Sequence, residues 1–185
     1  MSELRTQAGV QQEPAQKKHV RVWTDGACIG NPGAGGYAAV LLFGEHRREI
    51  SGGYRRTTNN RMELMAVIAA LEALKYPCQV TVHSDARYVV DGVTDGGMRR
   101  WHAARWRRGE HGRVPNADLW ERLLVQCQRH EVTLTWVPAH QGVAENERCD
   151  ELSVLAATAE DLAVDLGYEQ RDDTVPAEPT LFDGL

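Results

Sequence analysis

The sequence predicts an α/β protein in which one mixed β-sheet is covered by helices. Three segments with the period of a strand come first, at residues 19–25, 37–43 and 47–54. The most regular helix follows at 61–75, and two further strands alternate with helices after it. Elements in this order favour a single sheet with helices packed against it, and we find no internal repeat in the sequence.

The first half of the chain supplies the hairpin strands and the best helix. Residues 27–36 are rich in glycine and contain a proline, which predicts a turn-rich loop after the first strand. The next two strands are joined by a short hairpin at 44–46. One apolar stripe on helix 61–75 predicts that it packs on the sheet, and Pro77 ends it. The stripe consists of Leu64, Val67, Ile68, Leu71 and Leu74.

The second half predicts a shorter pair of strands among several helices. A strand at 79–84 is followed by helical stretches near 87–93, 98–107 and 118–130. Residues 132–137 alternate again and predict the last strand. A final helix is expected from about 143 to 165 or somewhat less.

Composition and length limit the class of protein. The 185 residues are 42% hydrophobic and 25% charged, which is ordinary for a globular protein. No apolar run approaches the roughly 18 residues needed to span a bilayer, and the N-terminus lacks the apolar core of a signal peptide. We therefore expect a cytoplasmic protein with no membrane contact. Its four cysteines lack paired spacing and are expected to be free thiols.

Three regions are predicted along the chain. Residues 1–18 are polar and are expected to be a disordered lead-in, 19–160 form the folded domain, and 161–185 form an acidic, flexible tail. Residues 160–185 contain eight acidic residues and one arginine. The rest of the chain is therefore mildly basic although the net charge is −5, which is compatible with a polyanionic partner.

Four acidic residues stand in places that predict a metal site. Asp25 and Asp85 each close an apolar strand, Glu63 lies at the start of the best helix, and Asp150 lies in the last helix. Parallel neighbouring strands would bring both strand ends to one edge of the sheet, where ligands gather in α/β proteins. Close carboxylates repel one another unless a cation neutralises them, and Mg²⁺ prefers oxygen ligands.

Each acid also has a plain structural interpretation when it is taken singly. Asp25 precedes a glycine as in many turns, and Asp85 is a good N-cap for the next helix. Glu63 completes a capping box with Asn60 as N-cap, and Asp150 fits a solvated helix face. A zinc site is not favoured, because Cys28 and His140 have no second ligand at the right spacing.

Five sequence blocks resemble bacterial ribonuclease HI, in the order of that family. They are Thr24–Cys28, Thr57–Leu64, Ser84–Val89, Val137–Gly142 and Glu145–Leu152. The resemblance covers roughly residues 19–158. It implies a ribonuclease H-like fold with a five-stranded mixed sheet flanked by helices. It also implies an endonuclease that hydrolyses the RNA strand of RNA–DNA hybrids.

The resemblance assigns the four acids to metal binding and catalysis. It implies that Asp25, Glu63, Asp85 and Asp150 hold two Mg²⁺ ions, with Mn²⁺ as a plausible substitute, and that the products carry a 5′-phosphate and a 3′-hydroxyl. His140 lies in a loop beside Gly142, where an imidazole can shuttle a proton or help product leave. A surface histidine is the plain alternative.

Arginines and tryptophans are concentrated between residues 99 and 113, with only Glu110 opposed. This segment resembles the basic protrusion with which the family grips the DNA strand, and arginines suit phosphate contacts. A solvated charged helix is the alternative, and Trp101 and Trp106 are equally well read as core anchors. The residues expected to contact substrate are Arg99, Arg100, Arg105, Trp106, Arg107 and Arg108.

A second set of expected substrate contacts comes from the loops. The resemblance implies that the amides of Asn31, Asn59 and Asn60 lie along the minor groove of the hybrid, and that Thr58 holds a DNA phosphate. Arg87 stands where many members have an amide that touches a base, so a phosphate contact is the alternative there. Cys28, which ends the first block, completes the set.

Two rival functions and one partner remain open. A catalytically inactive hybrid-binding module is disfavoured because no acid of the set is replaced. An integrase or exonuclease on the same fold is disfavoured by the start of helix 61–75 and the arginine-rich segment. We expect a monomer. The end of the chain, Pro179 to Leu185, is either a disordered tail or a peptide that docks on a replication protein.

Overall fold

The computed structural model describes residues 18–139 and 141–170 and contains one five-stranded sheet. Its strands are β1 (His19–Ile29), β2 (Gly33–Phe43), β3 (His46–Thr57), β4 (Gln79–Ser84) and β5 (Glu131–Trp136), in the order β3-β2-β1-β4-β5. β1 is antiparallel to β2 and parallel to β4, and β4 is parallel to β5. The predicted five-stranded mixed sheet is confirmed.

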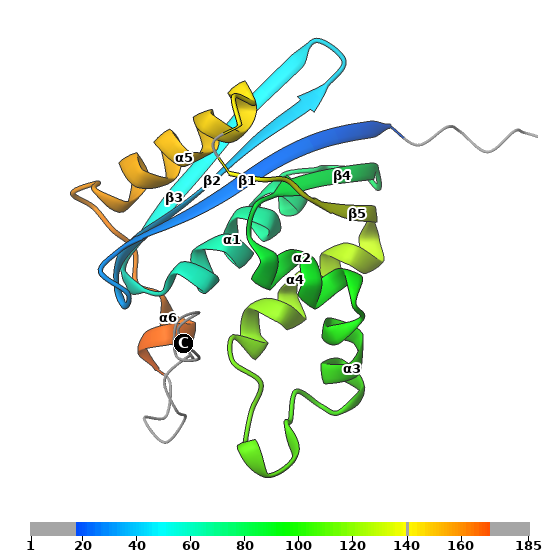
Figure 1. The fold of residues 1–185 in the computed structure, drawn as a ribbon, viewed down its shortest axis with the longest axis vertical. Coiled ribbons are helices and arrows are strands. Elements are labelled where there is room, and N and C mark those ends of the chain that lie inside the picture. Colours follow the sequence, from blue (N-terminus) through cyan, green and yellow to red (C-terminus); the bar gives the residue numbers. More distant parts are fainter. Residues whose placement is uncertain (1–17, 140, 171–185) are drawn as a thin grey trace, which may run out of the picture.

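Helices cover both faces of this sheet (Figure 1). α1 (Asn59–Glu72) lies on one face, together with α2 (Arg87–Thr94), α3 (Gly97–Ala103) and α4 (Ala117–Arg129), while α5 (Ala144–Ala157) lies on the other. A 3-10 turn at Gly109–His111 and a short helix α6 (Leu166–Glu169) complete the elements. Within the described part of the chain, no helix combines the length and apolarity needed to cross a membrane.

The alternation of side chains along β1 separates two apolar cores. Val20 and Val22 point toward α1 and are buried in the large core that also contains Ile68 and Trp120. Trp23, the next residue of β1, points to the opposite face and packs with Val40 of β2 and Cys149 of α5. Period-two burial of this kind is what a sheet with both faces covered requires.

The glycine-rich segment 27–36 is mostly strand, not the predicted loop. β1 continues to Ile29 and β2 begins at Gly33, so only a tight turn separates them. A Cβ atom on Gly26 would lie 2.4 Å from the backbone nitrogen of Glu63, and one on Gly36 would lie 2.1 Å from the carbonyl oxygen of Ser153. These two glycines are therefore needed for close approach of α1 and α5 to the hairpin.

Helix boundaries also differ from the prediction. α1 begins at Asn59 with Thr58 as its N-cap, so the alternative interpretation of Glu63, a capping box with Asn60 as N-cap, is wrong. Asn60 lies inside the helix, and a carboxylate oxygen of Glu63 lies within 4.8 Å of Asp25 and Asp85 at the sheet edge. Asp85 is likewise not the N-cap of α2, a place that Ala86 takes. α5 ends at Ala157, well before residue 165.

The segment that follows α5 packs against the domain beyond the expected boundary at residue 160. Ala163 pairs with the edge strand β3, since its carbonyl accepts the N–H of Arg55 at 2.9 Å. Asp165 is 5% exposed, and its carboxylate accepts hydrogen bonds from Thr57 and Arg61. The predicted flexible tail therefore cannot include residues 161–170. The lead-in before Lys18, His140 and residues 171–185 lie outside the described part of the chain.

Candidate active site

Three acidic side chains meet at the edge where β1 and β4 approach α1. Asp25, Glu63 and Asp85 each offer a carboxylate oxygen, and these oxygens all lie within 4.8 Å of one another. β1 and β4 run parallel with Thr24 opposite Ser84, so the residues that follow, Asp25 and Asp85, lie at the same edge. Gly26 then lets the start of α1 approach β1, which brings Glu63 to both acids.

Burial and mutual repulsion shape the protonation of this carboxylate cluster, defined as Asp25, Glu63 and Asp85. Desolvation, with the negative charges of Asp85 and Asp150, raises the pKa of Asp25 from 3.8 to about 6, although a hydrogen bond from Ser153 opposes the rise. Desolvation raises the pKa of Glu63 well above its usual value, and the charges of Asp25 and Asp85 add to this. The cluster is therefore poorly compensated by the protein alone.

The carboxylate cluster fits a divalent cation. Glu63 is 6% exposed, and its Oε2 atom has no hydrogen-bond partner among the described residues. A buried oxygen without a partner is costly, and a cation ligand relieves that cost. No arginine or lysine within 18–139 and 141–170 forms an ion pair with these three acids. Hard oxygen ligands in this number suit Mg²⁺ or Mn²⁺.

Asp150, the fourth predicted acid, lies next to the cluster but outside the 4.8 Å group. It belongs to α5, and its negative charge helps to raise the pKa of Asp25. Ser153, one turn later on α5, links the two acids. Its hydroxyl lies 2.5 Å from Oδ2 of Asp25 and 2.9 Å from the carbonyl oxygen of Asp150. Sequence analysis missed Ser153, although its i+3 spacing from Asp150 was a usable signal.

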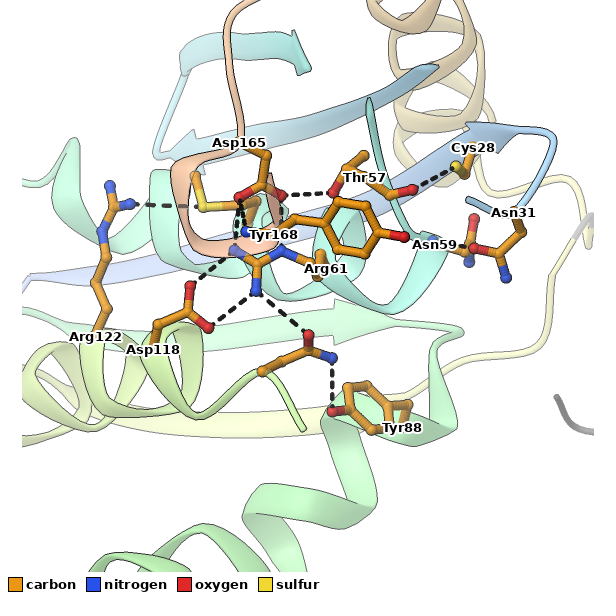
Figure 2. Close-up of polar contacts among 12 residues, drawn as sticks. Cys28, Asn31, Thr57, Asn59, Arg61, Tyr88, Asp118, Arg122, Asp165 and Tyr168 are labelled. Atoms are coloured by element: carbon orange, nitrogen blue, oxygen red, sulfur yellow. Dashed lines mark hydrogen bonds and ion pairs between the residues drawn. The ribbon is translucent and has the colours of Figure 1, made fainter. Parts of the chain in front are cut away.

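A second group of charges lies around buried Arg61, two residues before Glu63 (Figure 2). The Arg61 guanidinium is 1% exposed and donates to both carboxylate oxygens of Asp165 at 2.7 Å. It also donates to both oxygens of Asp118, at 2.9 and 2.8 Å. Burial alone would lower the pKa of Arg61, but these hydrogen bonds raise it above its usual value. We call Arg61, Asp118 and Asp165 the arginine cluster.

Hydrogen bonds extend the arginine cluster to neighbouring elements. Thr57, at the end of β3, donates from its hydroxyl to Asp165 at 2.7 Å. Arg61 also donates to the amide oxygen of Asn116 at 3.3 Å, and that amide donates to the Tyr88 hydroxyl at 3.1 Å (Figure 2). The start of α1 is therefore tied to β3, α2, α4 and the segment after α5. The sequence carried no signal for these long-range pairs.

Four predicted substrate residues line one groove beside the carboxylate cluster. The groove has a volume of about 540 Å³ and is bounded by α1, α2, α3 and the segment before α4. Its polar lining includes Asn60, Arg87, Arg100 and Arg108, and Trp101 supplies an aromatic wall. Asp91 and Asp95 also face it, so the lining carries both signs of charge. The structure thus brings together residues that the sequence separates by almost fifty positions.

The remaining loop residues gather at the turn between β1 and β2. The side chain of Asn31 accepts the backbone N–H of Asn59 at 3.2 Å, which holds this turn against the start of α1 (Figure 2). The Cys28 thiol donates to the carbonyls of Gly30 at 3.1 Å and Thr57 at 3.5 Å. Burial raises the pKa of this thiol. Thr58 is 6% exposed at the N-cap of α1.

Trp106 packs inside the domain. Its side chain is 6% exposed and belongs to the large core, which favours the core-anchor alternative, and its expected substrate contact stays a prediction. The indole anchors the segment after α3, because burying this large apolar ring is more favourable than leaving it in solvent. Arg99, Arg105 and Arg107 are exposed around it. His140 belongs to the undescribed part of the chain.

Comparisons with known proteins agree with this geometry. A family model described as RNase H matches residues 17–158. The chain is 55% identical over 152 residues to "Ribonuclease H" of Syntrophus aciditrophicus, covering 82% of this chain and 88% of that protein. It is 50% identical over 150 residues to "Ribonuclease HI" of a Synechocystis strain, covering 80% and 94% of the two chains.

A solved structure gives the same result in three dimensions. The crystal structure of LC9-RNase H1, "a type 1 RNase H with the type 2 active-site motif", superposes with a TM-score of 0.72 at 31% identity. The match covers 88% of this chain and 85% of that one. The family model spans most of the chain and includes all four predicted acids. The chain therefore belongs to the ribonuclease H family, as a bacterial HI-type endoribonuclease.

Proposed function

We propose that this enzyme hydrolyses the RNA strand of RNA–DNA hybrids with two divalent ions held by Asp25, Glu63, Asp85 and Asp150. The single observation that carries this proposal is the convergence of Asp25, Glu63 and Asp85 within 4.8 Å of one another, with an oxygen of Glu63 buried and unpartnered among the described residues. An uncompensated cluster of this kind is unfavourable by itself and favourable around cations.

The residues around the cluster have distinct tasks in this proposal. Bound Mg²⁺ ions would supply an activated water and stabilise the leaving 3′-oxygen, which gives a 5′-phosphate and a 3′-hydroxyl. The four carboxylates hold those ions, with Mn²⁺ as a substitute. Ser153 orients the carboxylate of Asp25 through a 2.5 Å hydrogen bond. His140, which lies outside the described residues, takes or delivers a proton as product leaves in this proposal.

The groove supports contact with nucleic acid along its basic lining. Arg100 and Arg108 suit phosphates of the DNA strand, and Asn60 extends the groove toward the carboxylate cluster. Asn31 and Asn59, held together by a hydrogen bond, suit the shallow minor groove of a hybrid. Cys28 and Thr58 lie on either side of the same turn and complete this set of expected contacts. Exposed Arg99, Arg105 and Arg107 add phosphate contacts.

Monomeric state, cytoplasmic location and a tail-bound replication protein stay predictions.

One experiment tests the reaction and the metal site together. A labelled RNA strand is offered as hybrid, RNA duplex and single strand with Mg²⁺, to the wild type and to Asp85→Asn. We expect cleavage of the hybrid alone, and a cleavage rate more than about 100-fold lower in the variant. Mutation of residues that only hydrogen-bond to metal ligands already lowers activity about 10- to 100-fold. Hybrid binding without cleavage by the wild type would instead identify a binding module. End-group analysis of the products checks the predicted 5′-phosphate.

A further inference from the structure

Arg87 and Trp136 form a stacked pair at the same sheet edge as the carboxylate cluster. Arg87 is the first residue of α2, and Trp136 is the last residue of β5. The Arg87 guanidinium carbon lies 3.8 Å from the centre of the indole ring, which is a close cation–π contact. Such stacking limits the motion of an otherwise long and mobile side chain. The guanidinium therefore has a defined place although it is on the surface.

The same indole also contacts the backbone of a cluster residue. Nε1 of Trp136 donates to the carbonyl oxygen of Asp85 at 3.1 Å. Strand register makes this contact natural, because Trp136 pairs with Ser84, the residue immediately before Asp85. One tryptophan thus uses its face for Arg87 and its N–H for Asp85. It joins a surface cation to the peptide that carries a metal-binding carboxylate.

Arg87 is placed to contact a ligand and not only its neighbours. Its side chain is 58% exposed, and it lines the groove with Asn60, Arg100 and Arg108. Its ion pair with Asp91 is 3.8 Å long, beyond hydrogen-bond range, and both partners are about half exposed. An exposed pair of that length contributes little and does not oppose exchange for a phosphate oxygen.

We propose that Trp136 is a positioning residue that couples a phosphate contact by Arg87 to the placement of Asp85. Its ring holds the Arg87 guanidinium against a backbone phosphate of the hybrid, and its N–H holds the Asp85 carbonyl. At this place the chain then recognises charge and not base identity. The inference rests on the proposed function, because it concerns the same hybrid substrate.

Arg87→Gln tests the phosphate contact. We expect KM for the hybrid to rise about 5- to 10-fold, as for loss of a charge-assisted hydrogen bond, with kcat nearly unchanged. The slope of log kcat/KM against log salt should become shallower by about 0.7–0.9, the value for one phosphate contact. Arg129→Gln is the matched control. It removes one exposed arginine at the end of α4, next to the start of β5, and should change neither quantity.

Trp136→Phe and Trp136→Leu separate the two contacts of the indole. Phenylalanine keeps an aromatic face for Arg87 but has no N–H, so kcat should fall about 3- to 10-fold while KM stays constant. Leucine removes both contacts, so KM should rise as well. The double variant Arg87→Gln with Trp136→Leu should have a KM no higher than that of the worse single variant. The two effects do not add, because both substitutions remove the same phosphate contact.

Binding without catalysis gives an independent measurement. Fluorescence anisotropy with a labelled hybrid and no divalent ion should show weaker binding for Arg87→Gln and Trp136→Leu, and wild-type binding for Trp136→Phe. If Arg87→Gln matches Arg129→Gln in KM, salt slope and anisotropy, or if Trp136→Phe keeps the wild-type kcat, the inference is overturned. A wild type that does not cleave hybrid would instead remove the proposed function itself.

Discussion

The arginine cluster and the carboxylate cluster begin two residues apart on α1, yet their charges are arranged in opposite ways. Arg61 is surrounded by Asp118 and Asp165, and four hydrogen bonds of 2.7–2.9 Å join it to their oxygens. Glu63 instead faces two further carboxyl groups, Asp25 and Asp85, and keeps one oxygen without a partner among the described residues. The fold supplies opposite charges to the first cluster, whereas the described residues form no ion pair with the second, which fits a divalent cation.

The comparison separates residues that stabilise the fold from residues that act on substrate. A buried charge pair with all its hydrogen bonds made resists change, because removing one partner leaves the other without compensation. A buried group of like charges costs stability in the empty protein and is retained where a ligand uses it. The two clusters should therefore respond to mutation with opposite signs.

The largest effect is expected from breaking the arginine cluster. Arg61→Met leaves Asp165, which is 5% exposed, without its cation, and should lower the free energy of unfolding by about 3–5 kcal/mol. Urea unfolding at pH 7 measures the change. Arg122→Met is the control, since it breaks a half-exposed pair with Glu72 and should cost at most about 1 kcal/mol. Equal losses for both variants would contradict the distinction.

The next largest effect should have the opposite sign. The pKa of Asp25 is about 6 in the folded protein, above its ordinary value of 3.8. The protonated carboxyl therefore contributes its full stability below about pH 4, and this contribution is lost as pH rises through about 6. Asp25→Asn removes that loss and should stabilise metal-free protein at pH 7 by about 2–3 kcal/mol. The gain should vanish near pH 4 and shrink when Mg²⁺ is added. Destabilisation at pH 7 in EDTA would refute this view of the carboxylate cluster.

A smaller effect should come from one hydrogen bond at the rim of the arginine cluster. Thr57→Val keeps the shape of a fully buried side chain but removes the hydroxyl that donates to Asp165 at 2.7 Å. We expect the free energy of unfolding to fall by about 1–2 kcal/mol, as for a hydrogen bond to a charged acceptor. Thr57→Ser, which keeps the hydroxyl, should restore most of the hydrogen-bond energy in the same urea measurement.

The smallest effect is expected at the outer surface of the same region. Glu169 forms a two-pronged ion pair with Arg55 at 2.9 and 2.6 Å, and hydrogen bonds to Arg55 lower the pKa of Glu169. Because Arg55 is 59% exposed and Glu169 is only partly covered, the pair is well solvated, and Glu169→Gln should leave the unfolding midpoint unchanged within error. A clear loss of stability would mean that α6 depends on this pair and not on buried Asp165.

Sequence analysis reached most of the fold, but it misjudged places where distant elements meet. The strands and helices followed from periodicity. Asp25 and Asp85 share an edge as predicted because β1 and β4 are in parallel register, although β1 continues to Ile29 and Asp25 does not end it as expected. Glycines 26 and 36 looked like turn residues, since a close approach of α1 or α5 leaves no local pattern. Trp106 gave no sign of whether it faces the core or the substrate, because burial depends on what packs over it.

The sequence by itself determined the layered α/β fold, the family and the identity of the four candidate acids, because periodicity and short motifs are local properties. Only the tertiary structure decided which charges are compensated. Arg61 finds Asp165 across 104 residues and Asn116 across 55, and Trp136 reaches the carbonyl of Asp85 across 51. Such contacts depend on sheet register and helix packing, which bring together side chains that no spacing along the chain relates.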